Sequence, residues 1–189
     1  MKKAYVVGIA GGSASGKTTF SAKLAEALRG MAVLELHMDS YFKPAEERRV
    51  AEAPITGAPY RDDNHPSSFY MEKLRDDLKK AVDSGEHQVI LIEGLLTLQD
   101  AAINEMLDLR LFVECQADER IVRRLKRNMQ WGLSFDEIAG VYLDMVRYRH
   151  GEYVEPSKWR ADLILNGSNP SAAALSMIAS HVRANISEG

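Results

Sequence analysis

The chain has 189 residues, of which 46% are hydrophobic and 27% are charged. This length fits one domain and allows a sizeable core without disulfides or a structural metal. The formal net charge of −3 excludes an overall positive field of the kind that drives nonspecific nucleic-acid binding. Cys115 is the single cysteine, which excludes an intrachain disulfide and suits a reducing compartment. It ends an apolar run, so we expect a core or edge thiol rather than a nucleophile.

The N-terminus and the hydrophobic runs indicate the cellular location to expect for the protein. Lys2 and Lys3 precede a short apolar stretch that leads into a glycine-rich loop rather than into a signal-peptide cleavage site. No run approaches the ~20 apolar residues of a membrane span. We therefore expect a cytoplasmic protein with no membrane partner.

Residues 11–18, GGSASGKT, form the strongest functional motif, a complete G-x-x-x-x-G-K-[ST] phosphate loop. The apolar run 4–10 before it is typical of a buried strand, and residues 19–29 after it carry apolar side chains at helical spacing. Because the motif requires a strand before it and a helix after it, a chance glycine-rich turn would need two further coincidences.

The residue types of this loop explain how it would bind a nucleoside triphosphate. Its glycines let backbone N–H groups point toward a polyphosphate, and the following helix presents its positive N-terminus to the same anion. Lys17 is predicted to reach the β- and γ-phosphates, and the Thr18 hydroxyl is predicted to bind Mg²⁺. The predicted nucleotide-binding residues are Gly11, Gly12, Ser13, Ala14, Ser15, Gly16, Lys17, Thr18 and Thr19.

Five apolar runs predict the strands of one sheet, at residues 4–10, 32–38, 88–93, 109–114 and 162–166. Helical segments separate these runs, and strands joined through helices pair in parallel. The sequence therefore predicts a three-layer α/β fold with five parallel strands in the order 2-3-1-4-5, the phosphate loop following the central strand, and right-handed crossovers.

The remaining segments complete a single predicted domain, 1–189. Beyond the helix at 19–29, helices are predicted at 67–84 with Ser67 or Ser68 as the cap, at 95–107, at 118–130, at 134–149, and after a cap at 168–170 to about residue 186. The proline-rich stretch 40–70 is predicted to be an irregular substrate-covering segment, and residues of about 120–150 a helical lid.

Two acidic residues end the second and third predicted strands. Ligands of open parallel sheets collect at the carboxyl ends of the strands, so Asp39 is a candidate substrate residue, with a turn-capping aspartate as the alternative. Glu93 ends the third run, where phosphate-loop proteins keep an acid that holds Mg²⁺ or its water. These positions predict an acid at the substrate site and a metal-binding acid.

The predicted helix 118–130 is rich in cations. Arg123 and Arg127 share one face, and Arg120 shares another with Arg124, so the helix can direct two arginines one way. A solvated basic face and an RNA-binding stripe are alternatives. Beside a phosphate loop, we favour a lid helix that clamps the transferring phosphate.

Several separated motifs together resemble the uridine kinase and phosphoribulokinase family of P-loop kinases. They are GGSASGKTT at 11–19, MDSYFK at 38–43, HPSSF at 65–69, EGLL at 93–96, LFVECQADERIVRRLKR at 111–127 and YVEPSKWRADLIL at 153–165. They occur in the family's order and span nearly the whole chain, so the resemblance implies the P-loop NTPase fold.

The resemblance implies an enzyme that transfers the γ-phosphoryl of ATP, with Mg²⁺, to a primary hydroxyl of a nucleoside similar to uridine or cytidine. Lys17, Asp39 and Arg124 would be catalytic, with Asp39 as the base or orienting group, and Thr18 and Glu93 would bind the metal. The implied substrate-binding residues are Asp39, Tyr41, Asp63, Asn64, His65, Arg123 and Arg127.

The chain departs from the family pattern at three places. Asn64 precedes His65 where uridine kinases have an aspartate that binds the ribose diol. Trp131 and Leu133 stand where the lid continues with arginines, and Val141 stands where a glutamine is expected. Residues 85–87 replace a hairpin that contacts the pyrimidine, which predicts that this wall is missing.

Three classes of function remain open on the sequence. The leading class is a small-molecule kinase, whose acceptor is a nucleoside or another alcohol such as nicotinamide riboside or pantothenate. The second is a nucleotide-binding regulatory protein that has lost phosphotransfer, which the replaced lid arginines favour. The third is an RNA-binding module, which the net negative charge disfavours. A homo-oligomer is compatible with the sequence.

Overall fold

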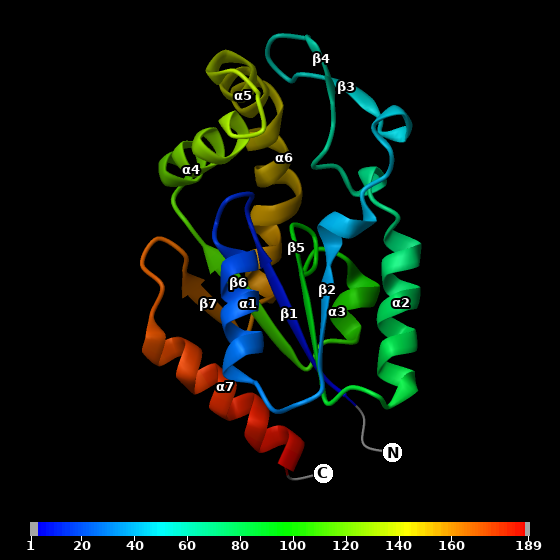
Figure 1. Ribbon diagram of the computed structural model, residues 1–189. Helices are drawn as coiled ribbons and strands as arrows, with labels where there is room; N and C mark the ends of the chain where they lie inside the picture. The colour runs from blue at the N-terminus through cyan, green and yellow to red at the C-terminus, as the bar shows by residue number, and fades with distance from the viewer. Residues whose placement is uncertain (1–3, 188–189) are drawn as a thin grey trace.

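The computed structural model describes residues 4–187, which form a parallel sheet with helices on both faces (Figure 1). The five strands of this sheet are β1 (Tyr5–Gly11), β2 (Val33–His37), β5 (Val89–Gly94), β6 (Leu109–Glu114) and β7 (Leu163–Asn166). They lie in the order β2-β5-β1-β6-β7, and every neighbouring pair is parallel. The fold class predicted from the sequence is therefore confirmed.

Two further strands lie outside this sheet and were missed by the sequence analysis. They are β3 (Val50–Glu52) and β4 (Pro59–Arg61), which form an antiparallel hairpin within the stretch expected to be irregular. Because strands are numbered along the chain and β3 and β4 lie outside the large sheet, the strand order of that sheet is written 2-5-1-6-7. The five predicted runs, counted alone, lie in the expected order 2-3-1-4-5.

Alternation along the central strands produces a hydrophobic core on each face of the sheet. Val6 and Ala10 face one core, and Val7 and Ile9, also in β1, face the other. Helices α2 (Met71–Ser84) and α3 (Ala101–Glu105) cover the first core, and α1 (Lys17–Ala27) and α7 (Ala172–Ser187) cover the second. The central strands, buried on both sides, read as continuous apolar runs for this reason.

We call the run of helical segments after β6 the lid, because its first part was predicted to be one. Its first helices lie above the carboxyl ends of the strands, and its later part passes behind the sheet (Figure 1). The segments are α4 (Ala117–Met129), α5 (Phe135–Val141), a π-helical segment Tyr142–Val146, α6 (Arg147–Arg149), a second π-helical segment His150–Val154, and a 3₁₀ helix Glu155–Arg160. The helix predicted at 134–149 begins as expected, because Ser134 and Glu137 form a capping box. It continues well beyond residue 149.

Other helix boundaries differ from the sequence-based expectation. Neither Ser67 nor Ser68 caps α2, because the Ser68 hydroxyl donates to the Asp62 carbonyl at 2.6 Å and α2 begins at Met71. Residues 95–100 form turns, and Asp100 caps the short α3. The cap of α7 is Ser171, which accepts from the Ala174 N–H at 3.2 Å, rather than residues 168–170.

Among the described residues, no helix is long and apolar enough to cross a membrane. Cys115 is buried and is not disulfide-bonded, in agreement with the expected core or edge thiol.

Gly94 fixes the approach of β5 to the segment after β2. A Cβ at this position would lie 2.3 Å from the Cβ of Met38, which is fully buried. We therefore expect Gly94→Ala to lower the free energy of unfolding by about 1–3 kcal/mol, as overpacking does elsewhere. Urea denaturation measures this change. Gly151→Ala is the matched control, because a Cβ there meets no atom within 4 Å. Equal losses in both variants would contradict the packing argument.

Candidate active site

The phosphate loop leads from β1 into α1 with the backbone geometry of an anion site. Gly16 has a φ of 100°, in the region that favours glycine, and Ala14 has a φ of 64°, which is uncommon for a residue with a side chain. Within the described chain, no side chain caps the N-terminus of α1. Its first N–H groups and its dipole are therefore directed at the loop, where they favour a phosphate.

Two residues of the lid region, Arg120 and His150, pack closely against the loop at Gly12. A Cβ at Gly12 would lie 2.6 Å from Nη1 of Arg120 and 3.0 Å from Cε1 of His150. Arg120 donates to the Cys115 carbonyl at 3.0 Å, and His150 contacts Glu155 at 3.2 Å. Burial, and next the charge of Arg120, lower the pKa of His150. Arg120, one of the cations of the predicted basic helix, therefore lies against the loop at Gly12.

Lys17, Thr18 and Glu93 meet where β5 ends beside the loop. The Thr18 hydroxyl donates to Oε1 of Glu93 at 3.2 Å, and Lys17 Nζ lies 3.9 Å from Oε2. His37 Nδ1 lies 3.1 Å from Oε1 of Glu93, a contact that the sequence analysis missed. Glu93 is 2% exposed, and its Oε2 accepts no hydrogen bond from the described residues.

The side chains of Thr18 and Glu93 together fit a Mg²⁺ site. The described residues contain no group of three or more His, Cys, Asp or Glu side chains that could hold a metal. Mg²⁺ is commonly bound through one or two carboxylates, with substrate phosphates and water completing its shell. A buried carboxylate oxygen without a hydrogen bond, next to a threonine hydroxyl and a phosphate loop, matches that need.

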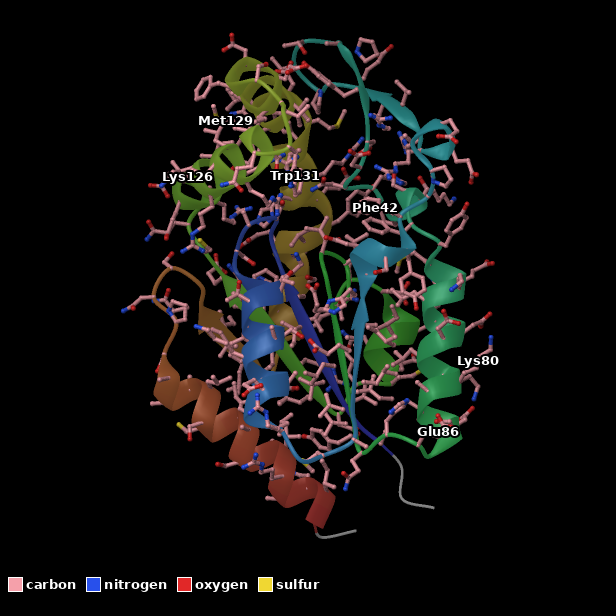
Figure 2. All side chains as sticks on the ribbon, viewed as in Figure 1. Phe42, Lys80, Glu86, Lys126, Met129 and Trp131 are labelled. Atoms are coloured by element: carbon pink, nitrogen blue, oxygen red, sulfur yellow. The ribbon has the colours of Figure 1, made fainter. Side chains whose placement is uncertain are left out.

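A cavity of about 760 Å³ opens above the loop, and the three residues expected to be catalytic, Lys17, Asp39 and Arg124, all line it. Asp39 lies in the 3₁₀ helix Met38–Tyr41 that follows β2, and it is exposed. Figure 2 shows Trp131, at the end of α4, and Phe42, beyond β2, on the two sides of this region, and both line the cavity.

Two arginines of α4 point at the phosphate loop. Arg124 donates to the Ser13 hydroxyl at 3.1 Å, and Arg127 donates to the same oxygen at 3.3 Å. Burial, and next the charge of Arg127, lower the pKa of Arg124, and its Nε is buried with no hydrogen-bond partner in the described chain. An anion at this point would satisfy Arg124 and separate the two like charges.

Arg123 lies on the other side of the loop, away from the larger cavity. It donates to the Gly167 carbonyl at 3.1 Å and lines a second cavity of about 310 Å³. Gly16 and Thr19, which the sequence predicted as nucleotide-binding residues, also line this space. Sequence reasoning missed other residues of its lining, which include Lys23, Asn166, Gly167 and Pro170. The position of Asn166 at the carboxyl end of β7 was the signal that could have identified it.

The expected acceptor residues after β4 divide between two environments. Asp63 and Asn64 line the larger cavity, and Asp63 lies 3.1 Å from Nη1 of Arg48. His65 does not line the cavity: its ring lies 2.7 Å from the Ser67 hydroxyl and 3.1 Å from Arg49, and its contact with substrate stays a prediction. Its ring caps the turn that begins at Pro66.

Tyr41, also predicted to bind the substrate, does not line the cavity. Tyr41 is buried against α2, where its hydroxyl donates to Asp77 at 3.0 Å, and burial together with that bond raises its pKa to about 12. Phe42 lines the cavity instead and stacks on Phe69, with ring centroids 4.1 Å apart. Tyr41 and Phe42 are adjacent in the chain, but their rings lie on different faces of this short helical turn.

The wall expected to be missing between α2 and β5 has a counterpart from another segment. Pro59, Tyr60 and Arg61 of β4 line the cavity. Opposite them, the lid contributes apolar side chains, namely Trp131, Leu133, Ile138 and Val141. Trp131 and Val141, which depart from the family pattern, therefore lie at the cavity.

The sequence of this chain is similar to those of known kinases. The model of the phosphoribulokinase and uridine kinase family matches residues 60–172. A uridine kinase from Bacillus licheniformis is 32% identical, over 96% of this chain and 95% of its own. A uridine kinase from Staphylococcus aureus is 30% identical over the full length of both chains.

Solved structures share the fold at lower identity. A candidate fructose transport system kinase from Silicibacter has a TM-score of 0.65 at 18% identity, covering 87% of this chain and 90% of its own. Shikimate kinase from Acinetobacter baumannii has a TM-score of 0.52 at 14% identity, covering 98% and 94%. These sequence matches show that this chain is a phosphotransferase with an alcohol acceptor and belongs to the phosphoribulokinase and uridine kinase family.

Proposed function

We propose that this enzyme transfers the γ-phosphoryl group of ATP to a primary hydroxyl of a nucleoside similar to uridine or cytidine, or of a related small alcohol. The observation that carries the proposal is that Lys17, Asp39 and Arg124 line one cavity. A phosphate-binding cation, an acid and a lid arginine thus surround one space, which is the arrangement that phosphoryl transfer to an alcohol needs.

ATP would bind across both cavities. Residues 11–19 would hold its phosphates, and the smaller cavity, lined by Arg123 and Asn166, would hold the base. Thr18 and Glu93 would hold Mg²⁺, which neutralises the charge that develops on the phosphates. Arg123 is thereby reassigned from the acceptor to the nucleotide, since it faces the side of the loop opposite Asp39.

The acceptor would lie in the larger cavity, with its hydroxyl between Asp39 and the γ-phosphorus. As the hydroxyl oxygen bonds to phosphorus, the bond from phosphorus to the β,γ-bridging oxygen breaks, and Asp39 accepts the hydroxyl proton. Lys17, Arg124 and Arg127 stabilise the charge on the phosphoryl oxygens.

The sugar side of the acceptor would meet Asn64 and Asp63. The Asn64 side chain, 8% exposed, can accept a hydrogen bond from a diol, although more weakly than a carboxylate. Asp63 is already engaged by Arg48, and this leaves Asn64 as the better placed partner. The expected consequence is looser selection for a ribose diol than in relatives with an aspartate.

A substrate panel tests the proposal. Consumption of ATP is measured with uridine, cytidine, nicotinamide riboside, pantothenate, fructose and shikimate, and product formation is checked by mass spectrometry. Turnover of uridine or cytidine above the other alcohols supports a nucleoside acceptor. ATP binding without a phosphorylated product from any of them would favour the regulatory alternative.

Lys17→Ala is expected to reduce phosphotransfer by about 10²–10³-fold, because it removes one preorganised cation from the charge that develops on the phosphate. Initial rates at saturating ATP measure the effect. Lys79→Ala, an exposed lysine paired with Asp83 on α2, is the control and should turn over like the wild type. Normal turnover by Lys17→Ala would exclude a catalytic phosphate loop.

Asp39→Asn is expected to lower kcat by about 10²–10⁴-fold and to leave ATP affinity nearly constant. The amide keeps the shape of the side chain but no longer accepts the hydroxyl proton, and Asp39 is not expected to touch the nucleotide. Steady-state kinetics and ATP titration separate the two effects, with Asp83→Asn on α2 as the control. Weaker ATP binding with intact turnover would refute the role assigned to Asp39.

A further inference from the structure

The β3–β4 hairpin and the lid are joined by a small hydrogen-bonded contact. The Tyr60 hydroxyl donates to Oδ2 of Asp144 at 2.9 Å, and the Thr56 hydroxyl donates to the same oxygen at 3.1 Å. Asp144 lies in the π-helical segment Tyr142–Val146. We call these three residues, Thr56, Tyr60 and Asp144, the clasp.

The clasp lies at the wall of the larger cavity. Tyr60 lines that cavity from the hairpin, and Gly140 and Val141 line it from the lid. A Cβ at Gly140 would lie 4.0 Å from the Tyr60 hydroxyl oxygen, so Tyr60 reaches over the lid helix at a position without a side chain. In Figure 1 the hairpin and α5 stand on opposite sides of the same end of the molecule. The clasp thus joins two walls of the acceptor cavity.

A second contact attaches the same segment to the same helical run, but deeper. Asp62, which follows β4 directly, is fully buried and accepts from Nε of Arg149 at 2.7 Å. The ring of His65 meets that of Tyr153 edge to face, with centroids 5.3 Å apart. The hairpin is therefore held by the lid at two levels, an outer clasp and an inner ion pair.

The two attachments differ in how readily they open. Removing one partner of a buried ion pair leaves an unpaired charge in a poorly solvated place, which is costly. The clasp consists of two neutral hydroxyl donors on one partly exposed carboxylate, and water can replace either donor. Exposed contacts of this kind open locally long before the core does.

We propose that the clasp is the gate of the acceptor cavity, with Tyr60 as a positioning residue, and that the Asp62–Arg149 ion pair is the hinge about which the hairpin moves. The hairpin opens at the clasp to admit the acceptor and closes over it before phosphoryl transfer. Closure retains the acceptor and keeps water from competing for the γ-phosphate. The inference rests on the proposed function only in naming the occupant of the cavity as the acceptor.

Hydrogen exchange of the free protein tests the gate without any substrate. In Tyr60→Phe, which keeps the ring but removes the donor, amides of residues 50–61 should exchange about five- to tenfold faster. Amides of the central strands should not change. Thr56→Val should add to the effect. Tyr148→Phe is the matched control, because the Tyr148 hydroxyl accepts from Arg147 and does not line the cavity.

Kinetics with uridine and MgATP test the role of the gate. Tyr60→Phe should raise the KM for uridine about three- to tenfold, leave the KM for ATP unchanged, and release more ADP than uridine monophosphate. Hairpin exchange equal to that of the wild type, or an equal rise in the central strands, would overturn the gate. If the wild type phosphorylates no alcohol, the proposed function fails, while the exchange result still decides whether the clasp opens on its own.

Discussion

The uncapped N-terminus of α1 is the feature on which the rest of the site depends. A phosphate bound there lies at the carboxyl edge of a parallel sheet, because β1 delivers the chain to that edge and α1 leads it away. Any residue at the end of a neighbouring strand is then near the phosphate, whatever its place in the sequence. Glu93 and Asp39 are acidic residues at two such ends, and the proposed function uses them for metal binding and proton acceptance at one anion.

The strands of the sheet and the phosphate loop could be predicted because each is encoded by a short stretch of consecutive residues. The phosphate loop is defined by consecutive residues, and a strand buried on both faces is an unbroken apolar run. Glu93 and Asp39 followed from one rule about strand ends. Helical spacing predicted a basic helix here but not the pairing of its arginines. Arg124 and Arg127 donate to the same Ser13 hydroxyl, whereas the spacing had paired each of them with a different arginine.

The residues around the larger cavity could not be predicted as well, because the segments that carry them have no regular hydrophobic period. The residues 38–41 form one short 3₁₀ turn, in which Tyr41 faces α2 and its neighbour Phe42 faces the cavity. The β3–β4 hairpin has strands of three residues, too short for an alternating pattern, and its contacts are with a helix more than 80 residues further along the chain. Arg123 was misassigned because its helix passes between two cavities, and spacing does not say which one a face meets.

The two π-helical segments of the lid run have a consequence for its angular phase. An α-helix advances about 100° per residue, whereas a π turn holds an additional residue, so each such segment rotates everything after it about the axis. Asp144 meets the hairpin, Arg149 meets Asp62, and His150 lies beneath Gly12, three contacts in different directions from seven consecutive residues. Deleting a single residue from Tyr142–Val146 would turn Arg149 and His150 away from their partners together. The length of this run is therefore as constrained as its composition.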